Sequence, residues 1–346
     1  MNTIRSRGMS LVEILIVVAI SFVVLAAIFK IFISAKENMV LQDNLARMQE
    51  NARVAIQALQ EDIRMAGFMG EIQEYWNVDY SSVQSVATSI TNECFNDYST
   101  TGFRWLAPMV SVGGNSTTAP AIPPKLAGQN NAKSHFDGCI SDANYRTATD
   151  VLTVHYAGPE TIADGALANT TYYLRSNLFN GIVFRSNGGS PPAPSDFASG
   201  PNTMNLPVRA RTYYVSADNA NPSLMRVELA SNGTLVTNPV AEGIVSMQVR
   251  YGVDTDSPVD GIANNYVDAD HGLLGGLRTA GNWPRWAKVR TVRIWLLLRS
   301  ADKFAGYTDP VGTYAMAGTN YTVEPGYRYQ LFVTTVAVRN SSGDES

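Results

Sequence analysis

The chain opens with RSRGMSLVEILIVVAISFVVLAAIFKIFI at residues 5–33, and this stretch decides how the rest of the protein is organised. About 20 apolar residues cross the hydrocarbon core of a bilayer as one helix, and the run from Met9 to Phe29 is long enough to do so. Arg5 and Arg7 precede the run, which predicts that the N-terminus stays in the cytoplasm and that the following residues are exported.

A cleaved secretory signal is the alternative explanation for an apolar N-terminus. Such a signal ends in small residues at its cleavage site, and Ser34 and Ala35 would supply them. The apolar run is long for a secretory signal, and it continues into a helical pattern. We therefore interpret the segment as a retained membrane anchor.

Glu13 is out of place in this apolar run. A carboxylate within a membrane helix costs roughly 2.5–3.5 kcal/mol on insertion scales. A protonated or snorkelling side chain near the cytoplasmic edge would reduce that cost. A positive partner inside an assembly would offset it, and we prefer this second explanation.

The leader, the glycine, the apolar run and the glutamate together resemble the class III signal of type IV pilins and type II secretion pseudopilins. The resemblance implies that a prepilin peptidase cuts after Gly8 and N-methylates Met9. It also implies that Glu13 pairs with the N-terminal amine of a neighbouring subunit. A buried carboxylate and a buried ammonium can offset each other's desolvation only if they meet.

The helical pattern continues well beyond the apolar run. Pro and Gly are absent from residues 9–66, and Gly67 is a suitable stop. Apolar residues recur at spacings of three and four, which predicts that this half of the helix packs on a sheet. A short coiled coil is the alternative. The stripe consists of Leu41, Leu45, Met48, Ala52, Ile56, Leu59 and Ile63.

Two further segments narrow the resemblance to one branch. QEDIRMAGFMG at residues 60–70 looks like the helix end of large minor pilins of the PilW type. WLLLRS and VAVRN, near the C-terminus, look like the last strands of the same proteins. Residues 71–240 are largely without such likeness.

The remainder of the chain predicts an antiparallel sheet with inserted loops. Strand patterns occur at 151–156, at 171–185 with an Asn180-Gly181 turn, and at 212–226. Residues 244–251 alternate, which predicts a strand with one buried face, whereas 289–300 and 327–340 are apolar on both faces and predict central strands.

The expected fold class is therefore α+β, a pilin-like fold with a long N-terminal helix packed on an antiparallel sheet. We expect a leader at residues 1–8, a transmembrane or filament-core helix at 9–33 and an amphipathic half at 34–66. A periplasmic globular domain is expected at 67–346.

Cys94 and Cys139 are the two cysteines of the chain, and both lie in a loop-rich region. An exported chain with two cysteines most simply forms one disulfide. Free catalytic thiols are the alternative, but only His135 is near them in sequence. The sequence therefore predicts a structural disulfide.

YGVDTDSPVDGIANNYV at residues 251–267 gathers Asp254, Asp256 and Asp260 in one loop. Family members often carry an acidic loop at this place that looks like a calcium loop, and calcium favours several oxygen ligands. This sequence departs from the usual spacing, and no glutamate closes the loop. We weigh a calcium site against a solvated turn rich in Asp and Asn, and prefer the turn.

Composition limits the other functions. The 346 residues carry a net charge of −4 with 16% charged residues, so no overall basic field points to nucleic acid. A cluster of basic residues and tryptophans could bind a phosphate and stack a base, but we expect ordinary strand packing and no direct DNA binding. This cluster consists of Arg285, Lys288, Arg290, Arg293, Trp283 and Trp286.

An enzyme is not expected. The chain lacks the nucleophile-elbow, zinc-protease, P-loop and dinucleotide-binding motifs. Its histidines, at positions 135, 155 and 271, are isolated from one another in sequence. We expect no cofactor apart from the calcium alternative.

The resemblance implies a minor pilin that joins a tip or priming complex and promotes type IV pilus assembly, with motility, adhesion or DNA uptake as downstream roles. Its partners would be the prepilin peptidase, other minor pilins and the major pilin. It would begin in the inner membrane and end at the pilus tip. The alternatives are a type II secretion pseudopilin and a tip adhesin.

Overall fold

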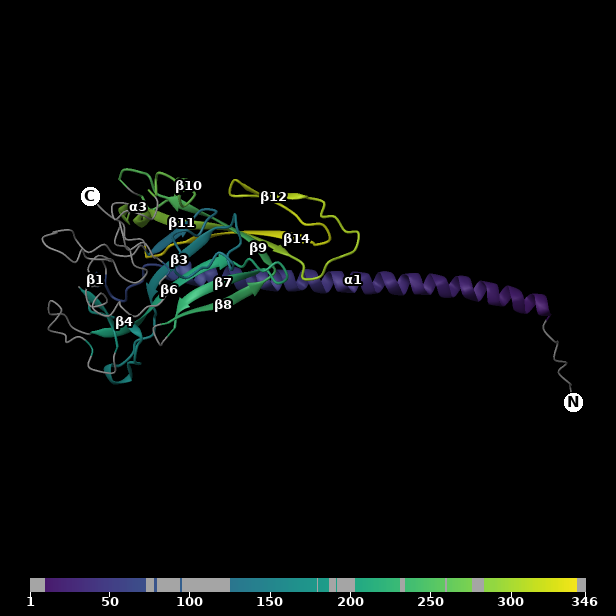
Figure 1. Ribbon diagram of the computed structural model, residues 1–346, viewed down its shortest axis with the longest axis horizontal. Coiled ribbons are helices and arrows are strands. Elements are labelled where there is room, and N and C mark those ends of the chain that lie inside the picture. The colour runs from purple at the N-terminus through teal and green to yellow at the C-terminus, as the bar shows by residue number, and fades with distance from the viewer. Residues whose placement is uncertain are drawn as a thin grey trace. The chain divides into compact units, whose positions relative to one another are not determined.

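The computed structural model describes most of the chain (Figure 1). The described residues are 10–72, 78–79, 94, 125–178, 180–186, 191, 203–230, 234–258, 260–275 and 283–340.

One helix, α1, runs from Leu11 to Met65 and is 55 residues long. It ends where the sequence predicts, because Gly67 adopts φ 76°, a left-handed conformation that glycine enters without steric cost. A Cβ at Gly67 would also lie 2.8 Å from Cδ of Lys125. The long N-terminal helix expected from the sequence is therefore confirmed.

The chain divides into two compact units, Met1–Gln49 and Glu50–Ser346, and α1 runs through both. Among the described residues, α1 is the only helix long and apolar enough to cross a membrane. Its apolar side chains between Leu11 and Ile33 are exposed. These properties suit a membrane anchor.

The second unit consists mainly of strands. In the described residues they are β1 (Val78–Asp79), β2 (Leu126–Gln129), β3 (Val151–Ala157), β4 (Tyr172–Ser176), β5 (Gly181–Arg185), β6 (Met204–Val215), β7 (Ser223–Leu229), β8 (Leu235–Glu242), β9 (Ile244–Val253), β10 (Asn265–Val267), β11 (Val289–Arg299), β12 (Thr313–Met316), β13 (Thr319–Thr322) and β14 (Tyr329–Ala337). A 3-10 turn (Asp164–Ala166) and a short helix α3 (Trp283–Ala287) lie between them.

Two main sheets are formed by the described strands. The first has the order β1-β5-β4-β6-β3-β2, and β7 pairs with β6 and with β8. The second has the order β10-β9-β11-β14, and β12 with β13 forms a separate ribbon. The pairings between these described strands are antiparallel, except that β1 runs parallel to β5. The expected α+β fold of pilin type, a long helix with antiparallel sheets, is confirmed.

Within the second unit, the part of α1 from Glu50 onward contacts both sheets (Figure 1). Its side chains Ala52, Ala55, Leu59 and Ile63 are buried, as amphipathic packing requires. Asp62 of the same face bonds to tyrosines of β3 and β6, and Gln60 donates to Thr334 of β14 at 3.1 Å.

Strand β9 differs from its expected pattern. The alternation predicts one buried face, yet Ser246 and Gln248 on the opposite face are also buried. Gln248 donates through Nε2 to Oδ1 of Asn131 and to the carbonyl of Ala148, so the segment between β2 and β3 covers this face. A polar side chain with two acceptors can be buried without loss.

Strand β14 also differs from expectation. Its apolar sequence predicts a central strand, and β11 is indeed central, between β9 and β14. Among the described strands, however, β14 pairs only with β11 and is an edge. Val333 of this strand is 52% exposed.

The hairpin of β4 and β5 forms as expected, but its turn is longer. Gly181 is not a turn residue; it pairs with Ser176 inside the ladder. Asn177 closes the turn instead, because its N–H donates to the carbonyl of Asn180 and its Oδ1 accepts from the N–H of Asn180. A Cβ at Gly181 would lie 2.5 Å from Cδ1 of Ile72, so a larger residue here would have to displace the end of that side chain.

Candidate functional site

The processing site expected at Gly8 and Met9 lies outside the described residues. Glu13 lies in the first turn of α1, where its N–H donates to the carbonyl of Ser10 at 3.0 Å. Its side chain is exposed among exposed apolar neighbours. A carboxylate in that setting is available to a neighbouring chain.

Asp62 is the buried carboxylate that attaches the second half of α1 to the first sheet. Its exposed fraction is 1%. Its oxygens accept hydrogen bonds from the hydroxyls of Tyr156 and Tyr213 at 2.8 and 2.5 Å, and from Nη1 of Arg211 at 2.5 Å. A buried charge with a cation and two hydroxyl donors is compensated in the way that burial demands.

The surrounding groups keep this network in one protonation state. Burial raises the pKa of Tyr156 and Tyr213, and the charge of Asp62 raises both further. The two hydroxyls therefore stay protonated and act as donors to Asp62. Arg211 also pairs with Glu228 at 3.2 Å, which links β6 to β7.

Sequence reasoning did not identify Asp62. The apolar stripe passes through Leu59 and Ile63, and Asp62, three residues after Leu59, lies beside it on the helix. A carboxylate between two core positions was the available signal. Its donors come from β3 and β6, about 90 to 150 residues later, and no local pattern specifies them.

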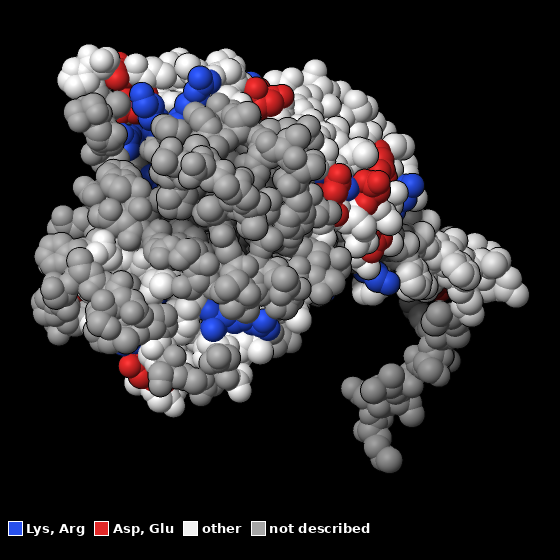
Figure 2. All heavy atoms as spheres, turned by 60° about the vertical axis from the view of Figure 1, so that its left-hand side comes forward, with Lys and Arg blue, Asp and Glu red and all other residues white. Residues whose placement is uncertain are grey.

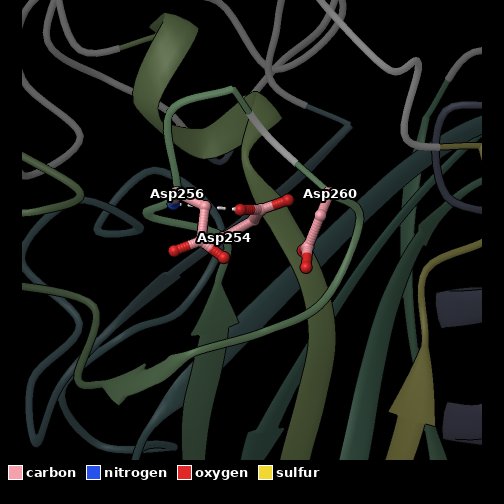
Figure 3. A group of neighbouring side chains, drawn as sticks. All are labelled: Asp254, Asp256 and Asp260. Carbon is pink, nitrogen blue, oxygen red and sulfur yellow. Dashed lines mark hydrogen bonds between the residues drawn. The ribbon is translucent and has the colours of Figure 1, made fainter.

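Asp254, Asp256 and Asp260 do come together in one loop (Figure 3). One ligand oxygen of each lies within 4.8 Å of the others. Asp254 is fully buried, whereas Asp256 and Asp260 are exposed.

Protein donors already occupy these three carboxylates. Asp254 accepts from the N–H groups of Asp256 and Gly261 at 3.2 and 2.7 Å. Asp256 accepts from Nδ2 of Asn264, and Asp260 accepts from the N–H of Ile262, both at 2.8 Å. Hydrogen bonds from Asp and Asn side chains therefore hold this loop together.

A cation faces the buried member of this group. Nε of Arg290 lies 3.6 Å from Oδ2 of Asp254. Burial raises the pKa of Asp254, but the N–H donors of Gly261 and Asp256 and the charge of Arg290 lower it by more, so the net pKa is below its usual range. The carboxylate is ionised, and Arg290 supplies positive charge where calcium would.

The basic cluster considered for DNA is divided among separate contacts. Trp286 is buried and meets the ring of Tyr251 edge-on at 4.9 Å. Arg293 stacks on Tyr266 at 4.1 Å. On the face drawn in Figure 2, the described Lys and Arg residues form separate groups and not a continuous basic stripe.

The cysteines and histidines lie apart from the Asp254 loop. Cys94 and Cys139 form a disulfide with an S–S distance of 2.05 Å. His155 is buried in β3, and His271 accepts a hydrogen bond from the N–H of Leu273 in an exposed turn. Among the described residues, no cysteine or histidine joins the three aspartates of the loop in a group that could hold a metal ion.

The family model of the type IV pilus-assembly protein W matches residues 212–340. This range begins in β6 and ends just after β14, so it includes the whole second sheet and the Asp254 loop. The match supports a type IV pilus protein of the PilW type. No curated protein and no solved structure matches it.

The PilW match supports a role in type IV pilus assembly. It agrees with the apolar, exposed first half of α1, which lies outside the matched range and suits a membrane anchor. Association with other pilus-assembly components follows from the same assignment. The individual site residues remain predictions.

Proposed function

We propose that this PilW-type chain is a minor pilin that joins a priming complex and starts polymerisation of the major pilin. The PilW match carries the proposal, because it specifies pilus assembly. The long helix and exposed apolar segment support it, because lateral packing of such helices is a means of assembly inside a membrane.

The proposed sequence of events begins at the cytoplasmic face. The prepilin peptidase removes residues 1–8 and methylates Met9. The mature subunit stays anchored by α1 and meets other minor pilins in the inner membrane. Glu13 then pairs with the amine of a neighbouring chain, which offsets the burial of both charges.

The size of the exported part supports a position at the tip of the pilus. The second unit, Glu50–Ser346, is large for a subunit repeated along a helical filament. A complex that starts the filament is pushed outward as the major pilin is added beneath it. We therefore place the mature protein first in the inner membrane and later at the pilus tip, with assembly and not catalysis as its role.

A deletion strain tests this function. We expect surface pili to be lost, and to return in part when the retraction motor is also deleted, because slow initiation is then no longer opposed by retraction. Complementation with the intact chain should restore normal numbers. Unchanged pilus counts in both backgrounds would contradict the priming role and would redirect attention to secretion or adhesion.

We propose that the Asp254 loop holds its form without calcium, because Arg290 and the donors already described satisfy its carboxylates. Thermal unfolding of the detergent-solubilised protein should give the same Tm in millimolar calcium as in chelator. A calcium-dependent rise in Tm that Asp256→Asn abolishes would show that the loop is a calcium site.

A further inference from the structure

The outer edge of β14 carries backbone groups that no described residue satisfies. Hydrogen bonds from Ser300 to the carbonyl of Arg328 and from Val338 to the carbonyl of Arg290 fix which residues face β11. Antiparallel pairing alternates, so the residues facing outward are Leu331, Val333, Thr335 and Ala337. Among the described residues, their N–H and carbonyl groups have no partner.

This edge also lacks the features that normally prevent strand addition. Natural edge strands carry prolines, charges or bulges that discourage pairing. The sequence of β14, YQLFVTTVA, contains neither proline nor a charged residue. The exposed edge of the other sheet, β8, contains Pro239 and Glu242 and has a register shift against β7. The contrast indicates that the edge of β14 remains available for pairing with another strand.

Positive charge lies at one end of the open edge. Arg293 donates to Oγ1 of Thr335 at 3.2 Å, and the exposed Arg339 follows the strand by two residues. No described carboxylate lies within 4 Å of either guanidinium. An incoming strand with a carboxylate at this end would complement both arginines.

We propose that β14 is a docking edge for an extended strand of another pilin subunit, and that an acidic residue of that strand meets Arg339. The inference rests on the proposed assembly role, since it identifies the surface through which that role is carried out. The backbone groups of β14 would supply affinity, and the side chains of Val333 and Thr335 would select the partner.

A second copy of this chain is a poor occupant of the same edge. In parallel register, pairing of β14 with itself would place Arg339 beside Arg339. In antiparallel register centred on Val333, Arg339 would approach Tyr327, whose ring already carries Arg299 at 4.1 Å and Lys303 at 5.6 Å. Like charges meet in both arrangements, which opposes self-pairing.

Photocrosslinking of the full-length protein in piliated cells tests the docking edge. Ala337 is replaced by the photoreactive residue p-benzoylphenylalanine, and cross-linked peptides are sequenced by mass spectrometry. We expect an adduct with a different pilin subunit, within a segment that contains Asp or Glu. Absence of an adduct, or an adduct with this chain itself, would overturn the proposal.

Blocking variants show whether the adduct depends on strand pairing. Val333→Lys places a charge on the edge without changing the backbone, and should reduce the adduct about ten-fold, equivalent to about 1.4 kcal/mol of binding. Thr335→Pro removes one outward N–H and leaves the β11 ladder intact, so it should act in the same way. Val236→Lys, on the edge strand β8, is the matched control and should leave the adduct unchanged. An adduct that survives both β14 variants would overturn the proposal.

Charge exchange provides an independent test of the acidic partner. Arg339→Glu should reduce the adduct, whereas Arg339→Lys should retain it. Equal adduct yields in Arg339→Glu and Arg339→Lys would show that the partner strand needs no acidic residue at this position. Pilus counts in the deletion strain report the assembly role, and adduct yield reports the docking edge, so failure of one is distinguishable from failure of the other.

Discussion

At the scale of a single residue, Asp62 determines how α1 packs on the first sheet. Its carboxylate finds three donors only when the helix has one rotation and one axial position relative to β3 and β6. A shift of the helix would leave a buried charge without donors, which is expensive. Apolar contacts alone would tolerate such a shift more easily, so Asp62 adds specificity to the packing.

Asp62→Ala should destabilise the protein by about 3 kcal/mol, because it leaves Arg211 and two tyrosine hydroxyls without their common acceptor. Urea denaturation of the detergent-solubilised chain measures this loss. The neighbouring Glu61→Ala, at an exposed position, is the control and should change stability by less than about 0.5 kcal/mol. Equal stability of the two variants would mean that the Asp62 network does not stabilise the fold.

The buried carboxyl group of Asp150 should make the stability of the protein depend on pH. Burial raises its pKa to about 7, and the charges of Asp268 and Asp270 add to this, while the N–H groups of Asn131 and Val249 oppose it. Between about pH 4 and pH 7, Asp150 therefore keeps its proton in the folded state and loses it in the unfolded state. Stability should fall as pH rises through this window, by an amount on the order of 4 kcal/mol.

Asp150→Asn should flatten that slope, since an amide does not titrate. The measurement is the free energy of unfolding of wild type and variant at intervals across the window. The slope is the decisive quantity, because the substitution also alters hydrogen bonds to Val249 and Asn131 and so shifts the whole curve. A wild-type curve that is level or rises with pH would contradict the assignment.

At the scale of elements, the two sheets are joined where β2 and the start of β3 meet β9. The N–H of Asp150 donates to the carbonyl of Met247, and Oδ2 of Asp150 accepts from Val249. Beside this junction, a Cβ at Gly128 would lie 1.9 Å from the hydroxyl of Tyr251 and 2.8 Å from the carbonyl of Val151. Only glycine allows so close an approach.

Gly128→Ala should destabilise the protein by about 1–3 kcal/mol through overpacking. Tyr251 is buried and one of the atoms in conflict belongs to the backbone, so neither can move away easily. Gly165→Ala, where an added Cβ meets nothing within 4 Å, is the control and should be close to neutral. Thermal unfolding of both variants measures the difference. Equal Tm values would show that the junction accommodates the added methyl group at position 128.

At the scale of the whole molecule, the proposed function depends on a membrane anchor that enters a larger assembly. Glu13→Ala should spare cleavage of the leader, because the proposed cleavage site follows Gly8, and should reduce surface pili to a small fraction of wild type. Mass analysis of the mature protein and pilus counts measure the two effects. Glu37→Ala, in the exposed part of α1 beyond the apolar run, is the control. Normal piliation in Glu13→Ala would end the pairing hypothesis.

The sequence by itself determined the features that depend on near neighbours. The extent of α1 follows from an uninterrupted helical pattern that stops at Gly67, and β3, β9 and β11 follow from short apolar or alternating runs. The PilW resemblance rested on residues at the helix end and in the last strands. The grouping of Asp254, Asp256 and Asp260 was also readable, because the three lie within one loop.

Only the tertiary structure decided which surfaces are covered. It made β14 an edge although its composition indicates a central strand, and it buried Ser246 and Gln248 beneath residues from a distant segment. It gave Asp62 its donors from β3 and β6, and it placed Arg290 beside Asp254. Periodicity records which way a side chain points, but the partner on that side comes from elsewhere in the chain, and pairing at long range has no local signature.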